Sequence, residues 1–515
     1  MGNATRGVGD GNRGGIRFGI RWDDGRRPKR LLLSLVAVCA ALAPVAAAEA
    51  RPAPAPAAVD VVVVAAPGRV DAAERLTARA GGTVRDSLQI VNGFTASVPR
   101  GAIARLQRSR AVRAVSRDGA LGLRSDPGAD AAASSSEVLR TATGADASAF
   151  DGAGVGVALL DSGAVELGGL GRPGSLVRGP DFSSEGDDRD LAGLDTFGHG
   201  THLAGVIAGH DPLNGFEGIA PGARVVSVKV AGADGVTSLA QVLAGMNWIR
   251  EQRDRLGIRV LNLSLGTTGE SDYRRDFLAW ASEQLWRDGI AVVASAGNEG
   301  QKAHILDMPA ADPYVIAVGA TDTNATPDPA DDRVADFSNR SVMRGPDVVA
   351  PGTGIVSLRV PGSTLDEEYP AARVGDAFFR GSGTSQSAAV VSGIAARLLG
   401  QRPGLTNDQL KVLLRAGAVD LADPPAADGA GRVDLARSEA LATPGPSVQR
   451  WPVATPDLRK LFKRGNREME TGATSWNGRR WSGMKWSGRR WSGMKWSGMK
   501  WNGMKWSGAE WDDAS

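Results

Sequence analysis

Between residues 137 and 443, short apolar runs alternate with helical segments, and this alternation leaves few folds open to the chain. The strand-like runs are Val155–Leu160, Val225–Val230, Val260–Leu265, Ala291–Ser295 and Val315–Ala320. Helical stretches, such as 238–255 and 274–288, lie between them. Because strands that are buried on both faces read as continuous apolar runs, the order predicts an α/β domain with a parallel sheet and helices on both faces. Chemistry is expected at the carboxyl ends of the strands of such a sheet.

The N-terminal region, residues 1–50, has the pattern of a secretory signal peptide. The basic residues at 26–30 precede an apolar run, Leu31–Ala48, that ends in small residues. A single membrane anchor is the alternative, because the run approaches the ~20 residues that span a bilayer. Pro44 and the small-residue end favour cleavage. Cys39 is the only cysteine, which excludes an intrachain disulfide framework.

Residues 51–117 predict a small α+β module in front of the α/β domain. The order of elements is strand, helix, strands, helix, strand, and it starts with the β-branched run Val59–Val64 and the helical stretch Asp71–Ala80. Residues 118–136 are rich in Gly, Asp, Ala and Ser, so a linker is expected there before the domain at 137–443.

After a second linker at 444–475, the C-terminal segment 476–515 repeats a tryptophan every five residues, interleaved with basic residues. A period of five matches neither one face of a helix nor one face of a strand. Binding to a cell-envelope polymer is one interpretation of this tail, and a tail without a specific ligand is the other. The net charge is only +3, with the basic excess mostly at the two ends, so nucleic acid is not an expected partner.

Three segments carry residue types suited to nucleophilic catalysis. Asp161 stands at the end of an apolar strand and is followed by Ser162-Gly163. His199 lies between two glycines at the start of a helical segment, and Ser385 stands at the entrance of an apolar helix that runs to Leu399. These positions supply an orienting acid, a base and a nucleophile in the chain order Asp, His, Ser, which is one of the known orders of a catalytic triad. Taken singly, each residue is equally well explained as a turn or capping residue.

Taken together, the segments resemble the three active-site signatures of subtilisin-like serine proteases, and residues 155–437 follow that pattern almost throughout. The resemblance implies Ser385 as nucleophile, His199 as general base and then acid, and Asp161 as the group that orients the imidazole. It implies Asn298, in Ala294-Ser295-Ala296-Gly297-Asn298, as a donor of the oxyanion hole. One departure is visible, because Ala389 stands where the family usually has a proline.

The resemblance also implies where a substrate binds. An extended peptide would lie as a strand between Ser264-Leu265-Gly266 and the stretch around Gly235-Val236-Thr237, with backbone hydrogen bonds giving affinity. The small residues Ala294, Ala296 and Gly297 predict a roomy first pocket and a preference for large apolar side chains, with tight core packing as the alternative.

In the same family, a module such as 51–117 is an inhibitory propeptide, and maturation is expected near residues 117–137. No cofactor is needed for catalysis. Structural calcium is common, and Asp181, Glu185, Asp187, Asp188 and Asp190 form an acidic loop with oxygen ligands of the required kind. A solvated surface loop is the favoured interpretation of these residues, and no metal ligands are assigned.

The function predicted from the sequence is therefore that of a secreted serine endopeptidase acting on proteins or peptides through an acyl-enzyme intermediate. A processing protease of narrow specificity is one alternative. An envelope-binding protein with an inert protease-like domain is the other, which the intact set Asp161, His199, Ser385 and Asn298 disfavours. Location outside the cell, with or without attachment to the envelope, follows from the signal peptide and the tail.

Overall fold

A computed structural model describes residues 58–123, 132–267, 272–446 and 448–454, all of which belong to one compact unit. The predicted signal peptide at 1–50 and the tryptophan tail at 476–515 lie outside the described residues. Within the described part of the chain, no helix is both long enough and apolar enough to cross a membrane.

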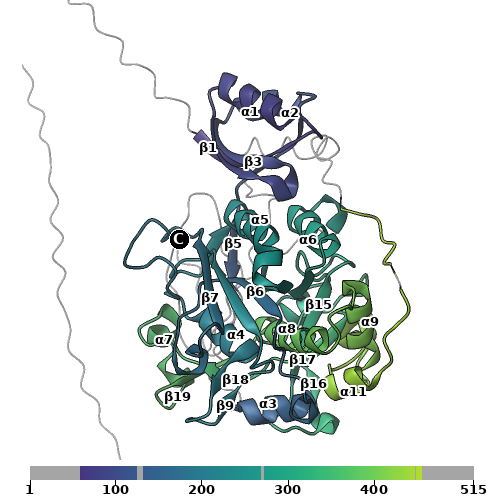
Figure 1. The fold of residues 1–515 in the computed structure, drawn as a ribbon. Helices are drawn as coiled ribbons and strands as arrows, with labels where there is room; N and C mark the ends of the chain where they lie inside the picture. Colours follow the sequence, from purple (N-terminus) through teal and green to yellow (C-terminus); the bar gives the residue numbers. More distant parts are fainter. Residues whose placement is uncertain (1–57, 124–131, 268–271, 447, 455–515) are drawn as a thin grey trace, which may run out of the picture. The chain divides into compact units, whose positions relative to one another are not determined.

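The N-terminal module is a four-stranded antiparallel sheet in the order β2-β3-β1-β4, with two helices (Figure 1). Its elements are β1 (Ala58–Ala65), α1 (Val70–Arg79), β2 (Thr83–Leu88), β3 (Gly93–Pro99), α2 (Ala102–Gln107) and β4 (Val112–Arg117). Alternation along β1 gives the sheet two apolar faces. Val61 and Val63 pack with Phe94 in the core of the module, whereas Val62 and Val64 pack in a cluster with residues of the larger domain.

The larger domain is built on an eight-stranded sheet whose main path is β16-β15-β14-β12-β6-β10-β7, with β17 paired to β15. Its strands are β6 (Gly156–Asp161), β7 (Leu176–Asp181), β10 (Arg224–Lys229), β12 (Ile258–Leu263), β14 (Ala291–Ser295), β15 (Ile316–Asp322), β16 (Arg333–Val334) and β17 (Val348–Pro351). All of these pairs are parallel except β15 with β16. The predicted parallel sheet is confirmed.

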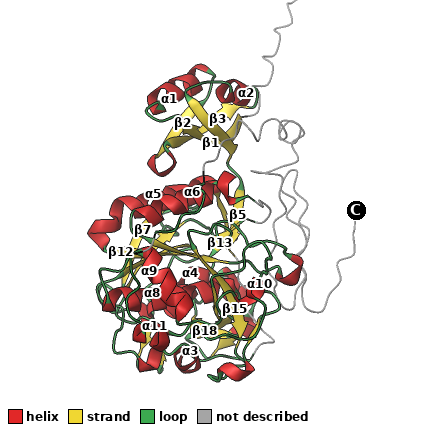
Figure 2. Cartoon of the chain, turned by 90° about the vertical axis from the view of Figure 1, so that its right-hand side faces the viewer, coloured by secondary structure: helices red, strands yellow, loops and turns green. Residues whose placement is uncertain are grey.

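Helices cover both faces of this sheet, as Figure 2 shows. Leu160 of β6 points into the cluster formed with α5 (Leu239–Leu256) and α6 (Phe277–Arg287). Leu159, its neighbour, points into the cluster formed with α4 (His199–Ala208) and α8 (Thr384–Gln401). The remaining helices are α3 (Ser136–Ala142), α7 (Thr364–Glu368), α9 (Asn407–Ala416), α10 (Pro425–Asp428) and α11 (Leu435–Ala440).

Small sheets complete the domain. They consist of β8 (His210–Asp211) with β9 (Phe216–Glu217), of β18 (Ile355–Leu358), β19 (Arg373–Val374) and β20 (Phe378–Gly381), and of β5 (Ala120–Leu123), β11 (Val236–Ser238) and β13 (Leu265–Gly266). Strand β5 lies inside the segment that we expected to be a linker. Its backbone pairs on both sides with the larger domain, which explains why composition alone did not reveal it.

The start of the second predicted linker, at residues 444–446 and 448–454, lies along the domain. The hydroxyl of Tyr273 donates to the carbonyl of Pro452 at 2.7 Å, and that of Tyr314 donates to the carbonyl of Trp451 at 2.8 Å.

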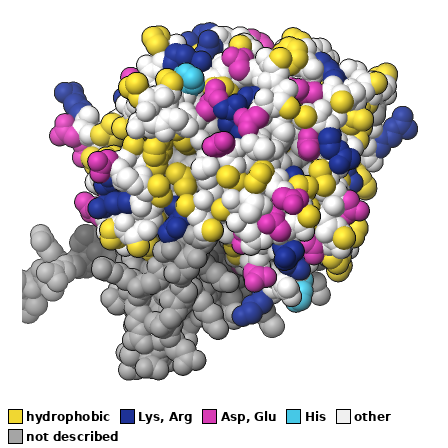
Figure 3. Space-filling model, turned by 90° about the horizontal axis from the view of Figure 1, so that it is seen from below, with side chains coloured by type: hydrophobic (Ala, Val, Ile, Leu, Met, Phe, Trp, Pro, Cys, Tyr) yellow, Lys and Arg dark blue, Asp and Glu magenta, His cyan; other side chains and the backbone are white. Residues whose placement is uncertain are grey.

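Figure 3 shows one face of the molecule. On the described part of this face, acidic, basic and apolar side chains are interspersed, and no large patch carries a single sign of charge.

Candidate active site

Asp161 and His199 form a buried pair. Asp161 is the last residue of β6, and His199 is the first residue of α4. The two side chains are fully buried, and Nδ1 of His199 lies 2.7 Å from Oδ1 of Asp161. Nε2, on the opposite side of the ring, has no hydrogen-bond partner among the described residues. The carboxylate therefore fixes the ring and leaves Nε2 as the nitrogen that can exchange a proton with another group.

A second buried carboxylate, Asp195, supports this pair, and the sequence analysis missed it. Asp195 accepts hydrogen bonds from the Ser162 hydroxyl at 2.7 Å and from the backbone N–H groups of Gly198 and Thr201 at 2.7 and 2.6 Å. Ser162 donates its own N–H to Asp161 at 2.8 Å. Burial raises the pKa of Asp195, while the surrounding donors act in the opposite direction. Asp195 thus holds both the start of α4 and the turn after β6.

The ring of His202, in the same helix, contacts two backbone carbonyl groups. Its Nε2 lies 3.2 Å from the carbonyl oxygen of Ile355 and 3.1 Å from that of Phe379. Burial lowers the pKa of His202 to about 4, so the ring is neutral near pH 7 and Nε2 carries the proton that these carbonyls accept.

Ser385 lies in the first turn of α8, a helix that packs against α4. Gly383 precedes the helix with φ of +156°, and Ser385 itself is fully buried. The Ser385 hydroxyl lies 3.4 Å from the carbonyl oxygen of Ser264, and the Ser264 hydroxyl lies 3.3 Å from the carbonyl oxygen of Ser385. The serine is therefore placed beside the end of the predicted substrate-binding segment 264–266.

Asn298 lies next to the same turn of α8. Its Oδ1 accepts hydrogen bonds of 2.9 Å from both the N–H and the hydroxyl of Thr384, the residue before Ser385. Because both groups are donors, Oδ1 is the amide atom that faces α8 and Nδ2 is directed away from Thr384. Asn298 is therefore hydrogen-bonded to the residue that directly precedes Ser385.

The predicted substrate-binding segments are brought together by the chain itself. Strand β5 lies between β11 and β13 and is antiparallel to both. Gly122 pairs with Val236 on one side and with Gly266 on the other, and Leu123 pairs with Leu265. The N–H of Leu123 also donates to the carbonyl of Gly235 at 3.0 Å. Residues 120–123 thus occupy the position that we predicted for a bound peptide.

The family model for the subtilase family matches residues 152–433, which is more than half of the chain. The chain belongs to the subtilase family of serine-type endopeptidases. It is 36% identical over 299 residues to serine protease AprX of Bacillus subtilis, covering 56% of this chain and 66% of AprX. It is 30% identical over 286 residues to subtilisin DY of Bacillus licheniformis, covering 54% of this chain and 88% of that protein.

A solved structure gives the same fold. Fervidolysin of Fervidobacterium pennivorans, described as a keratinolytic enzyme related to subtilisin, matches this subtilase with a TM-score of 0.60 at 24% identity. The match covers 77% of this chain and 63% of fervidolysin. The predicted fold class and family are confirmed.

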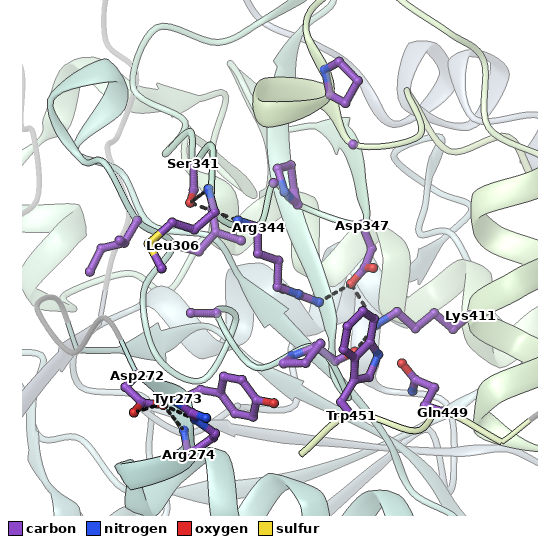
Figure 4. A pocket seen from close by; sticks show the side chains of 18 of the residues that line it. Asp272, Tyr273, Arg274, Leu306, Ser341, Arg344, Asp347, Lys411, Gln449 and Trp451 are labelled. Atoms are coloured by element: carbon purple, nitrogen blue, oxygen red, sulfur yellow. Dashed lines mark hydrogen bonds and ion pairs between the residues drawn. The ribbon is translucent and has the colours of Figure 1, made fainter. Parts of the chain in front are cut away.

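A large cavity lies apart from these residues. Figure 4 shows this cavity of about 830 Å³, in which Asp347 forms ion pairs with Arg344, at 2.7 Å, and with Lys411, at 3.1 Å. Tyr273 and Trp451 also line it, and none of Asp161, His199 and Ser385 does.

The acidic loop does not form a metal site within the described residues, where no cluster of three or more His, Cys, Asp or Glu side chains could hold an ion. Two of its carboxylates bind other groups of the protein. Glu185 accepts from Nζ of the buried Lys229 at 2.7 Å, and Asp181 accepts from the N–H groups of Ser183 and Gly193.

Proposed function

We propose that this subtilase is a secreted serine endopeptidase that cleaves proteins or peptides with Ser385 as nucleophile. The observation that carries the proposal is the buried pair of His199 and Asp161, with Nδ1 and Oδ1 2.7 Å apart, on a helix that packs against the helix of Ser385. Nε2 of His199 takes the proton of the Ser385 hydroxyl as the oxygen attacks the substrate carbonyl. Asp161 holds the ring in the required tautomer and stabilises the imidazolium that forms.

The acyl-enzyme is then resolved by water. His199 first returns its proton to the leaving amine, and it later takes a proton from the attacking water. Negative charge develops on the carbonyl oxygen of the substrate in both steps. We assign the side-chain N–H of Asn298 and the backbone N–H of Ser385 to that oxygen, because Thr384 fixes the orientation of the Asn298 amide.

Peptide substrates would bind as the middle strand of a three-stranded sheet, as β5 does. We infer that the N-terminal module is an inhibitory propeptide whose continuation fills the substrate site in the precursor. Besides the strand pairing of β5, two hydrogen bonds hold the N-terminal region against the larger domain. The N–H of Ile90 donates to Asn247 of α5 at 2.9 Å, and Asp118 accepts from the N–H of Ala240 at 2.8 Å.

The strand register suggests where maturation occurs. Leu123, the last residue of β5, is paired with Leu265, which directly follows Ser264. The carbonyl oxygen of Ser264 lies 3.4 Å from the Ser385 hydroxyl. We therefore propose that maturation cleaves the chain shortly after Leu123, within the range of 117–137 expected from the sequence.

Digestion of denatured casein tests the endopeptidase activity. The secreted protein should degrade casein, and a Ser385→Ala variant purified in the same way should not. Ala389→Pro is the matched variant, because it introduces the residue that the family usually has four positions after the serine. It keeps the Ser385 hydroxyl and should still degrade casein. Casein left intact by folded, processed wild-type protein would reject the proposal.

A further inference from the structure

Glu185 and Lys229 form a largely buried ion pair beside the candidate active site. Nζ of Lys229 lies 2.7 Å from Oε2 of Glu185, and the side chains of lysine and glutamate are 1% and 13% exposed. Lys229 is the last residue of β10 and pairs with Asp161 at the end of β6. Burial acts to raise the pKa of Glu185, but hydrogen bonds from Lys229 and two other groups lower it below its usual value. The carboxylate is therefore charged at neutral pH and paired with a buried cation.

The ammonium group of Lys229 binds the chain on both sides of Asp195. Nζ donates to the carbonyl of Leu194 and, at 3.2 Å, to the hydroxyl of Thr196. That hydroxyl in turn donates to the paired carboxylate at 2.7 Å. Because Asp195 holds the start of α4, the ion pair fixes the segment that leads into His199.

The other carboxylate oxygen of Glu185 binds the turn before β11, one of the two strands that flank β5. Oε1 accepts from the N–H of Ala233 at 2.7 Å. The carbonyl of Ala233 accepts from the hydroxyl of Thr364 at 2.7 Å, and the N–H of Thr364 donates to the carbonyl of Thr196 at 3.0 Å. Thr364 thus forms a second bridge between the same two segments.

The turn at 232–235 is also where β5 is held. The N–H of Leu123 donates to the carbonyl of Gly235 at 3.0 Å, and β11 then pairs with residues 120–122. Gly235 has a φ of +67°, and a Cβ atom on it would lie 2.7 Å from the ring of Phe197. Only glycine allows the turn to pack so closely on the segment before α4. A shift of this turn would move an acceptor of the bound peptide relative to the catalytic helix.

We propose that the ion pair of Glu185 and Lys229 positions strand β11 of the substrate site relative to the helix of His199. One carboxylate joins Thr196, three residues before His199, to Ala233, three residues before the start of β11. The inference rests on the proposed function and concerns how that site holds an extended peptide. Both residues act through the segments that they bind, so they are positioning residues and not catalytic ones.

Two chromogenic amides of different length test the proposal on the processed protein. The long substrate, acetyl-Ala-Leu-Gly-Leu-Phe p-nitroanilide, copies residues 120–123 and reaches β11. The short one, acetyl-Leu-Phe p-nitroanilide, lacks the residues that correspond to 120–122. Phenylalanine follows the preference for large apolar side chains expected from the sequence. The readout is the ratio of the two kcat/KM values, because a general loss of activity or of folded protein lowers both values alike.

Lys229→Met removes the ammonium group and keeps a long side chain. It should reduce the ratio of long to short substrate by roughly 10-fold, mainly through a higher KM for the long one, because a small displacement of a binding group removes much of its effect. Lys411→Met is the matched control, since Nζ of this buried lysine donates to the carbonyls of Pro313 and Val315 at 2.7 Å. The control should melt at lower temperature and keep the wild-type ratio. An unchanged ratio in Lys229→Met would overturn the proposal.

The variant Glu185→Leu tests whether the two residues act as a pair. The losses in Glu185→Leu and Lys229→Met should not add, so the double variant should lose about as much as either single one. Additive losses would contradict a joint role. The double variant leaves no unpaired buried charge, so it decides the proposal if the single variants do not fold. A double variant with the wild-type ratio would overturn it.

Hydrogen exchange separates this proposal from the proposed function, because it needs no activity. In full-length Ser385→Ala protein, residues 120–123 and 232–238 are paired. Adding Lys229→Met should speed exchange of these amides by at least about 10-fold, and adding Lys411→Met should not. Equal exchange would overturn the role of the ion pair even in an active enzyme. Wild-type protein that neither reacts with a fluorophosphonate probe nor cleaves peptides would reject the proposed function, and the exchange rates would still decide how β11 is held.

Discussion

Asp195 accepts a hydrogen bond of 2.7 Å from the hydroxyl of Ser162, whose backbone N–H in turn binds Asp161 at 2.8 Å. Asp161, whose carboxylate contacts His199, is therefore itself held by the backbone of Ser162. The side chain of Ser162 is in turn fixed by the carboxylate of Asp195. Gly200 donates its N–H to the same Ser162 hydroxyl at 3.0 Å, so the turn after β6 and the first turn of α4 are joined at one oxygen. When such a supporting group is removed, the catalytic side chain is held less firmly in its productive position, and the activity of the enzyme falls.

Asp195→Asn tests this support. An amide offers one acceptor oxygen where the carboxylate accepts three donors, so the turn should shift and kcat should fall roughly 10-fold with little change in KM. Asp211→Asn, in β8, removes another buried carboxylate away from the site and is the control. An unchanged kcat, with only a lower melting temperature, would show that Asp195 is merely structural.

Asp161→Asn should reduce kcat by about 10⁴-fold, the effect that the same substitution has in a serine protease of another fold. The amide would present an N–H to Nδ1 of His199 and favour the wrong tautomer of the ring. Steady-state kinetics on a protein that keeps its circular dichroism spectrum gives the answer. A loss of less than about 10-fold would contradict the role assigned to Asp161.

Asn298→Ala should lower kcat by roughly 10²–10³-fold and leave KM nearly unchanged, a magnitude known from this donor in subtilisin. The reason is that the amide N–H binds the oxygen only when it carries negative charge. Asn407→Ala, which removes a buried amide of α9 that donates to the carbonyl of Trp286, is a control for general loss of packing. Equal effects of the two variants on kcat would argue against an oxyanion hole at Asn298.

Asp312→Asn should stabilise the protein at alkaline pH. Burial raises the pKa of Asp312 from 3.8 to about 8, and its Oδ2 has no hydrogen-bond partner among the described residues. Between these two pH values the folded chain keeps a proton that the unfolded chain releases, so stability falls as the pH rises. The variant, which does not titrate, should gain on the order of a few kcal/mol in free energy of unfolding at pH 9.

Thermal melts in the Ser385→Ala background, which prevents self-digestion, measure this difference at pH 4 and pH 9. The advantage of Asp312→Asn over Asp312 should be small at pH 4, where the carboxyl group is protonated in the folded chain and still about half protonated in the unfolded chain. The exposed Asp376→Asn should show no such dependence on pH. A gain of the same size at both pH values would contradict the explanation by burial.

Leu121→Asp should weaken the inhibition of the precursor by its own module. Leu121 of β5 is 1% exposed and packs in the apolar cluster that includes Phe197 and Leu265. A carboxylate there should speed fluorophosphonate labelling of the full-length band by at least about 10-fold, because burying an unpaired charge disfavours the strand. Arg110→Asp, an exposed change on the same module, is the control. Labelling at the wild-type rate would show that β5 does not bar the site.

The sequence predicts the fold well because the apolar runs are long and continuous. The strand around Val155–Leu160 needs no tertiary information, and Leu159 and Leu160 pack on opposite faces of the sheet as a doubly covered sheet requires. The proposed catalytic residues can also be predicted from the sequence, since each stands in a local motif at a strand or helix end. Asn298 lies within such a motif too.

Other features depend on contacts between distant segments. Ser162 and Asp195 are 33 positions apart, and only the fold brings them together. The signal that could have revealed Asp195 is an acidic residue shortly before a helix start, which often caps the helix. Strand β5 is a strand because of its partners β11 and β13, while its Ala and Gly content is typical of a linker.

The most direct test of the account is the reaction of the secreted protein with a fluorophosphonate probe, compared between wild type and Ser385→Ala. The account predicts that the wild-type protein is labelled on a band smaller than the full chain and that Ser385→Ala is not labelled. A folded and processed wild-type protein that fails to react, or a Ser385→Ala variant that is labelled equally, would contradict the assignment of Ser385, His199 and Asp161 as a catalytic triad.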